Sequence, residues 1–285
     1  HRTRFEQKFS PRGRKRVDVL RETDTSLQLD LTVIAAVNDD ATLENNLLRS
    51  ELIANKRATL SCYRGFRSAS AAYNAGLDET RASIVVFVHQ DVFLPPCWED
   101  ALARAIREVE QIDPDWGVLG AFGLDPRGRA VGHVWSSGLG RRVGKRRKAP
   151  LEAVCLDELL IILRRDSGLR FDPDLPGFHL YGTDIVLAAR AAGLRSYVAD
   201  IPVIHNSRPV RQLGPDYVRA YRYMQRKWRA ILPVSTPIVP ITRNPWPLLR
   251  TRLRMALSWK KRAGRSTDPK TDPRKLVQKL DAVQS

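Results

Sequence analysis

The sequence predicts an α/β protein with a mostly parallel central sheet that is flanked by helices. Two observations carry this prediction. Strand-like and helix-like segments alternate from about Leu31 onward, which is the pattern of parallel strands joined by right-handed crossovers. The run from Ile84 to Val88 is continuously apolar and rich in β-branched residues, as expected for a strand that is covered on both faces.

The first predicted strand runs from Leu31 to Val37 and ends in the turn-forming sequence Asn38-Asp39-Asp40. Glycine is typical of the position just after a helix, and Gly193 marks the end of the last helix of the series. The complete prediction places strands at 31–37, 58–63, 84–88, 116–122, 153–164 and 196–205, and helices at 42–55, 68–78, 98–110 and 181–192.

Composition limits the classes of partner. The chain has 285 residues, enough for one large domain with extensions, and a net charge of +17 with a pI near 10.3. Such a charge attracts nucleic acid, an acidic membrane or phosphorylated substrates. The three widely spaced cysteines indicate reduced thiols, and no apolar run reaches the roughly 18 residues of a membrane span. We therefore expect a cytoplasmic protein, either free or peripheral at the inner face of the plasma membrane.

The charge pattern predicts four parts: a basic N-terminal arm at 1–28, the α/β domain at 29–207, a basic helical extension at 208–265 and a partly disordered tail at 266–285. In the extension, a helix-spaced aromatic stripe formed by Tyr217, Tyr221 and Trp228 is more typical of packing than of binding. The segment 246–262 has the pattern of a basic amphipathic helix, which either lies on an anionic bilayer or packs on the domain.

The most informative motif is His89-Gln90-Asp91, which directly follows the apolar strand at 84–88. Ligands of parallel sheets gather at the carboxyl ends of the strands. His89 and Asp91 are two residues apart and can point to the same side, where they can hold a hard cation on a phosphate. In the alternative interpretation, Asp91 caps the helix that follows and His89 is a hydrogen-bonded residue at the strand end.

Three other segments accompany this motif, in a fixed order. They are Ser70-Ala71-Ala72-Tyr73-Asn74-Ala75-Gly76, Gly177-Phe178-His179-Leu180-Tyr181-Gly182-Thr183-Asp184 and Ile204-His205-Asn206-Ser207. Together the four segments resemble the inverting family 2 glycosyltransferases of the GT-A fold, and most of all a glycosyltransferase-like subgroup whose strand ends in His-Gln-Asp. The resemblance covers about 31–207, and it implies a Rossmann-like sheet of the GT-A type.

The resemblance implies a nucleotide-sugar site at this strand end. Asp91 matches the last carboxylate of the family's Asp-X-Asp motif, which binds a divalent metal on the diphosphate. His205 matches a further metal ligand, although a histidine bonded to local backbone is the alternative. Oxygen ligands suit Mg²⁺ or Mn²⁺, and the imidazole favours Mn²⁺. His89 stands where the family has its first carboxylate, which contacts the ribose, and Gln90 lies between them.

The remaining donor contacts also follow from the resemblance. Asn38 and Asp39 fall where the first strand of such folds meets the base and the ribose. Asn74 and Gly76 match the Asn-Ala-Gly element that packs beside the diphosphate.

On the acceptor side, Asp184 matches the family's catalytic base. A carboxylate suits this role because the acceptor hydroxyl must lose a proton as it attacks the anomeric carbon. The alternative is a residue at a helix N-terminus that is stabilised by the helix dipole. Asp157 and Glu158 lie where the family begins the strand that lines the acceptor, or they form a solvated strand entrance.

The sequence thus favours a metal-dependent inverting glycosyltransferase of the hexosyltransferase type. It would transfer sugar from a nucleoside-diphosphate sugar to a saccharide or lipid-linked acceptor, in the synthesis of cell-surface polysaccharide or glycolipid. The alternative is a non-catalytic module that binds nucleic acid or another anionic polymer on the same scaffold. No nucleic-acid motif supports this alternative, and Asp91, Asp184 and His205 favour the enzyme.

Overall fold

A computed structural model describes residues 29–281 of the chain. The predicted basic arm at 1–28 lies outside the described residues, as do 282–285. Within the described part, no helix has the length and the apolar character needed to cross a membrane.

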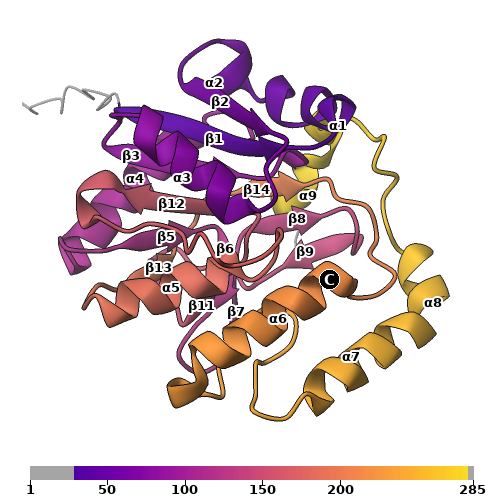
Figure 1. Cartoon of the computed structure of the whole chain (residues 1–285). Coiled ribbons are helices and arrows are strands. Elements are labelled where there is room, and N and C mark those ends of the chain that lie inside the picture. Colours follow the sequence, from indigo (N-terminus) through magenta and orange to yellow (C-terminus); the bar gives the residue numbers. More distant parts are fainter. Residues whose placement is uncertain (1–28, 282–285) are drawn as a thin grey trace, which may run out of the picture.

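A seven-stranded central sheet confirms the predicted class (Figure 1). β1 pairs in parallel with β2 and β3, and β5 pairs in parallel with β13. β12 lies antiparallel between β3 and β5, and β10 lies antiparallel beside β13, so five strands run in one direction. In spatial order the strands are β10 (Leu151–Glu152), β13 (Ser196–Val198), β5 (Val118–Gly120), β12 (Leu160–Arg164), β3 (Ile84–Val88), β1 (Leu31–Val37) and β2 (Thr59–Arg64).

The central strand β3 is buried on both faces, as its composition predicts. Val85 and Phe87 point into one hydrophobic core, whereas Val86 and Val88 point into another, because successive strand side chains alternate between faces. The first core is covered by α3 (Ala69–Glu79), α5 (Tyr181–Ala191) and α6 (Pro215–Lys227). The second is covered by α1 (Asp40–Asn45), η1 (Leu47–Arg49), α2 (Glu51–Ala54) and α4 (Trp98–Ile112).

Two small sheets extend the central one. One contains β11 (Cys155–Leu156), β6 (Phe122–Leu124) and β7 (Ala130–Gly132), and the other contains β4 (Val92–Phe93), β14 (Val203–His205), β8 (Val134–Ser136) and β9 (Arg141–Val143). The long predicted strands at 153–164 and 196–205 are therefore each divided between two sheets, and the predicted helix at 42–55 is divided into α1, η1 and α2.

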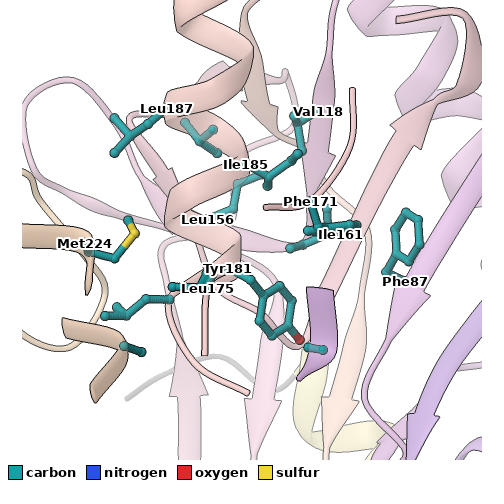
Figure 2. Close-up of a cluster of buried hydrophobic side chains, with 14 of the residues drawn as sticks. Phe87, Val118, Leu156, Ile161, Phe171, Leu175, Tyr181, Ile185, Leu187 and Met224 are labelled. Atoms are coloured by element: carbon teal, nitrogen blue, oxygen red, sulfur yellow. The ribbon is translucent and has the colours of Figure 1, made fainter. Parts of the chain in front are cut away.

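The structure has no boundary at 207. Tyr217, Tyr221 and Met224 of α6 are buried in the same core as α5, and Figure 2 shows Met224 beside the labelled side chains of that core. The rest of the predicted extension forms η3 (Arg229–Ile231), α7 (Trp246–Leu257) and α8 (Trp259–Ala263), while η2 (Arg165–Ser167) follows β12.

Residues 266–281, which belong to the tail that the sequence predicts to be partly disordered, contain short helices. This segment, which we call the C-terminal strap, returns across the domain and contains η4 (Pro273–Leu276) and α9 (Gln278–Asp281) (Figure 1). Leu276 and Leu280 are buried against Phe93 and Ile204, so apolar contacts hold the strap on the small sheet of β14. Because the segment is polar and contains two prolines, its sequence did not indicate that Leu276 and Leu280 are buried.

Candidate metal and nucleotide site

Two strand ends bring together the predicted ligands. β3 ends one residue before His89, and the chain then enters β4, whose Val92 pairs with His205 at the end of β14. This register puts His205 beside Asp91. The Nε2 atom of His205 lies 3.4 Å from Oδ1 of Asp91, and Nδ1 of His89 lies 3.9 Å from the same oxygen. One ligand atom from each of the three residues lies within 4.8 Å of the others.

The spacing and the donor types of this cluster fit a divalent cation. Ions of this kind bind nitrogen and oxygen at roughly 2.1 Å, so two ligand atoms of one ion lie no more than about 4.2 Å apart. Both contacts to Asp91 satisfy this limit. Two imidazoles and one carboxylate together offer nitrogen and oxygen ligands to such an ion.

The charges within the cluster are strongly coupled. Burial acts to raise the pKa of Asp91, but His205 outweighs it, and the pKa of Asp91 falls to about 2. Burial acts to lower the pKa of His205, but the Asp91 carboxylate outweighs it and raises that pKa. Burial lowers the pKa of His89, and proximity to His205 adds to the effect, so His89 favours the neutral imidazole that a metal requires.

A hydrogen-bond chain through Tyr181 fixes the orientation of His89. The Tyr181 hydroxyl donates its one proton to the backbone carbonyl of Glu158 at 3.0 Å, and the same oxygen lies 2.8 Å from Nε2 of His89. When the tyrosine proton is on this carbonyl, Nε2 of His89 is the donor in the second bond. A neutral His89 therefore keeps its lone pair on Nδ1, the atom that faces Asp91. Two acceptor atoms facing each other form a natural cation site.

Gln90 connects the ends of β3 and β1. Its side-chain Oε1 accepts from the backbone N–H groups of Asn38 (2.9 Å) and Asp39 (3.1 Å), and its Nε2 donates to Oδ1 of Asn38 at 2.5 Å. Asp39 in turn caps α1, because its two carboxylate oxygens accept from the N–H and the hydroxyl of Thr42. Gln90 therefore joins the two strand ends and, like Asn38, lines the cleft above them, whereas Asp39 lines a second cleft beside it.

A cleft of about 580 Å³ opens above this edge of the sheet, a volume typical of small-molecule sites. One end contains His89 and Asp91, and the other is formed by Tyr63 and Arg64 at the end of β2 and by Phe66 just after it. These three residues were not predicted as ligands, although their position at the end of the second parallel strand was an available signal.

A second cleft continues from the first beyond Gln90 and Asp91. Arg208 and Lys270 line it, and Lys270 belongs to the C-terminal strap. The strap is tied to the cluster by Asn206. The N–H of this residue donates to the backbone carbonyl of Asp91 at 2.8 Å, and its side-chain amide donates to the carbonyls of Pro269 and Thr271.

The predicted acceptor-side pair lies next to the cluster. Leu159 accepts a backbone hydrogen bond from His89, which places Asp157 and Glu158 at the carboxyl edge of β3. The charge of Asp157 acts on both imidazoles, since it contributes to raising the pKa of His89 and of His205. Burial, followed by the charge of Asp157, raises the pKa of Glu158 to about 8. Glu158 therefore favours its protonated form at neutral pH.

Asp184 does not lie at the cleft, so the structure corrects its predicted role as catalytic base. Its side chain is buried on the face of α5 that packs against α6, where Oδ2 accepts from Lys227 at 2.8 Å and Oδ1 accepts from the indole N–H of Trp228 at 2.7 Å. Burial raises the pKa of Asp184, and Lys227 offsets part of this effect. Both oxygens are thus engaged with α6 and the residue that follows it, and the side chain is almost fully buried.

Asn74 and Gly76 also have structural roles rather than the predicted donor contacts. The side-chain amide of Asn74 exchanges two hydrogen bonds with the backbone of Phe171, at 2.8 and 3.0 Å. A Cβ on Gly76 would lie 2.6 Å from the side chain of Ile34, so glycine permits α3 to pack closely on β1. Neither residue is among those that line the two clefts.

The fold and the cluster together define an α/β protein with a candidate metal site at the carboxyl edge of its central strand. The profile of a family described as "Glycosyltransferase like family" matches residues 32–225. The chain belongs to this glycosyltransferase-like family, which confirms the resemblance identified from the four motifs.

One curated relative is the protein "ATP synthase subunits region ORF 6" of Fuscovulum blasticum, which is 30% identical over 166 residues. The match covers 55% of this chain and 64% of that protein, so the chain spans less than two thirds of the relative's length.

Similar solved structures are distant in sequence. The mannosyltransferase PcManGT from Pyrobaculum calidifontis, in complex with GDP-Man and Mn²⁺, is 15% identical with a TM-score of 0.43, over 83% of this chain and 72% of that one. TarS 1-349 from S. aureus, in complex with UDP-GlcNAc, is 14% identical with a TM-score of 0.44, over 73% and 68% of the two chains. GalNAc-T7 with UDP, GalNAc and Mn²⁺ is 13% identical with a TM-score of 0.44, over 83% and 56%.

Proposed function

We propose that this protein is a metal-dependent glycosyltransferase that moves a sugar from a nucleoside-diphosphate sugar to an acceptor hydroxyl with inversion. The observation that carries the proposal is the cluster of His89, Asp91 and His205 at one end of a cleft of nucleotide size. Membership of the glycosyltransferase-like family supports it. A non-catalytic module would not need a ligand cluster whose imidazole is oriented by the chain through Tyr181.

His89, Asp91 and His205 would hold the divalent ion, with Mn²⁺ favoured over Mg²⁺ by the two imidazoles. A bound ion would neutralise charge that develops on the nucleoside diphosphate as it leaves. Asn38, Tyr63 and Arg64 line the other end of the cleft, where they would contact the base and the ribose. The diphosphate would then lie between the two ends.

Transfer in one step requires a base on the acceptor side. We assign this role to Asp157 in place of Asp184, because the backbone bond from His89 to Leu159 places Asp157 at the carboxyl edge of β3, and its side chain, unlike that of Asp184, is only partly buried. The acceptor oxygen would bond to the anomeric carbon while the bond from that carbon to the diphosphate oxygen breaks. The acceptor proton would pass to Asp157. The acceptor would be a saccharide or a lipid-linked saccharide, used in cell-surface polysaccharide or glycolipid synthesis.

The test combines binding and turnover. Calorimetry with UDP and GDP should detect binding that depends on Mn²⁺. Asp91→Asn should weaken this binding by at least about tenfold, because even the loss of a residue that only supports a metal ligand lowers metal affinity by about that factor. Asp115→Asn is a matched control, since that aspartate is 86% exposed and pairs only with Arg164. Equal effects of the two substitutions, or no metal-dependent binding at all, would contradict the proposal.

Asp157→Asn separates catalysis from binding. It should leave metal-dependent nucleotide binding intact and lower the transfer or the slow hydrolysis of donor sugars by about 10²–10⁴-fold, the usual contribution of a general base. Full turnover by Asp157→Asn would remove this residue from the mechanism without affecting the metal assignment.

A further inference from the structure

Helix α7 has an inner face that attaches it to the domain. Leu248 is buried in the core next to α6, and Met255 packs against the same core. The guanidinium of Arg252 donates from Nε to the backbone carbonyl of Leu213 at 3.1 Å. These contacts fix the orientation of the helix, which lies at the edge of the molecule beyond α6 (Figure 1).

The outer face of α7 carries an apolar stripe that no described residue covers. Trp246, Leu249, Leu253 and Leu257 are 61%, 54%, 60% and 80% exposed. They follow one another at spacings of three and four residues, so they lie along one side of the helix. Exposed apolar side chains that are contiguous, rather than scattered, mark an interaction surface.

Cations border this stripe. Arg250 and Arg254 on α7 and Lys260 and Lys261 on α8 are all exposed. The sequence contains no Asp or Glu between Asp216 and Asp268. Among residues 29–281, no salt bridge involves any of these four cations. The surface therefore combines apolar contact area with uncompensated positive charge.

We propose that this face of α7 and α8 binds an anionic lipid bilayer, with the apolar stripe in the interface and the four cations over lipid phosphates. Charge complementarity selects this occupant. A second copy of the chain would place the same cations opposite one another in a symmetric interface, and like charges oppose such pairing. Nucleic acid would engage the cations but would leave the apolar stripe in water.

This inference goes beyond the proposed function, because binding to a bilayer needs neither metal nor nucleotide. It can therefore fail or succeed independently of sugar transfer. It would, however, place the enzyme at the surface where a lipid-linked acceptor is found.

The experiment uses the full chain and sedimentation with lipid vesicles. Binding to vesicles that contain about 30% phosphatidylglycerol should exceed binding to pure phosphatidylcholine by about tenfold, and it should weaken as salt rises. Leu253→Ser with Leu257→Ser should reduce binding to the anionic vesicles by about tenfold, because it removes the inserted groups. Arg250→Gln with Arg254→Gln should reduce the difference between binding to the anionic vesicles and binding to the pure phosphatidylcholine vesicles.

Ile112→Ser is the matched control, since Ile112 is an exposed apolar residue (54%) at the end of α4 and should not affect binding. Circular dichroism checks that each variant is folded. The inference is overturned if the wild-type chain binds neither kind of vesicle, or if the Leu253/Leu257 variant binds as well as wild type. It is also overturned if the chain dimerises in solution and the same substitutions dissociate the dimer without affecting vesicle binding.

Discussion

The hydroxyl of Tyr181 provides a direct test of the metal site. It contacts no proposed ligand atom of the ion, yet it influences whether Nδ1 of His89 carries a proton. Tyr181→Phe keeps the aromatic ring in the core and removes only the oxygen between Nε2 of His89 (2.8 Å) and the carbonyl of Glu158 (3.0 Å). His89 then loses the acceptor that keeps its proton on Nε2. The proton can move to Nδ1, where it would point at Asp91 and occupy the metal-binding lone pair.

The expected loss is large enough to measure. Removing such a supporting hydrogen bond typically lowers metal affinity by about 10–100-fold, which corresponds to roughly 1.4–2.7 kcal/mol. The lost bond to the Glu158 carbonyl should also reduce the free energy of unfolding by about 1 kcal/mol. Calorimetric titration with Mn²⁺ measures the first quantity, and denaturant unfolding measures the second.

Tyr73→Phe is the control, because Tyr73 is buried in the same cluster and its hydroxyl contacts only the Tyr181 hydroxyl, at 3.4 Å. It should change metal affinity much less than Tyr181→Phe. If both variants bind Mn²⁺ equally well, the chain does not orient His89, and the argument for Nδ1 as a metal ligand is wrong.

Three further outcomes follow from the structure. Asp184→Ala should lower the free energy of unfolding by about 3 kcal/mol, because Lys227 would lose a buried partner, while the transfer or slow hydrolysis of donor sugars by the folded variant stays unchanged. Loss of that turnover in a folded variant would return the role of base to Asp184. Burial is the main reason that the pKa of Glu158 is raised to about 8, so the native state holds this proton more tightly than the unfolded chain, and the resulting stability is lost as pH rises toward and through about 8. Glu158→Gln should therefore raise the Tm relative to wild type at about pH 9 but much less at about pH 5, as scanning calorimetry can show. Burial raises the pKa of Cys155 to about 12, so a thiol reagent at neutral pH should modify the exposed Cys97 and leave Cys155 intact in the native protein, as peptide mapping can verify.

The sequence alone was sufficient to predict where the strands that carry the cluster end. His89 and Asp91 follow a strand whose composition alone shows that it is buried, and ligands at such a position are expected from the geometry of parallel sheets. Their proximity to His205 depends on the pairing of β4 with β14, a long-range contact that the resemblance implied and local pattern does not contain.

Asp184 shows why motif position alone was insufficient. The residue lies in the first turn of α5, as predicted, but the direction of its side chain is set by Lys227 and Trp228. These partners occur more than 40 residues later in the sequence. Only the packing of α6 on α5 shows that both oxygens of this carboxylate already accept hydrogen bonds.

The sequence contains a signal for the division of the last predicted strand between two sheets. Pro202 interrupts the apolar run at 196–205, and proline cannot donate to a sheet ladder. The chain leaves the central sheet after Val198 and enters the small sheet at Val203. This change of sheet places His205 beside Asp91.

The C-terminal strap affects which residues a shortened form of this protein must keep. A chain cut after Arg265 would still contain the three proposed metal ligands, yet Asn206 would lose the carbonyls of Pro269 and Thr271. The same asparagine holds the backbone of Asp91. A truncated protein that lost activity would therefore be no sign of catalytic residues in the tail. A segment more than 170 residues after Asp91 in the sequence thus supports the backbone that carries this carboxylate.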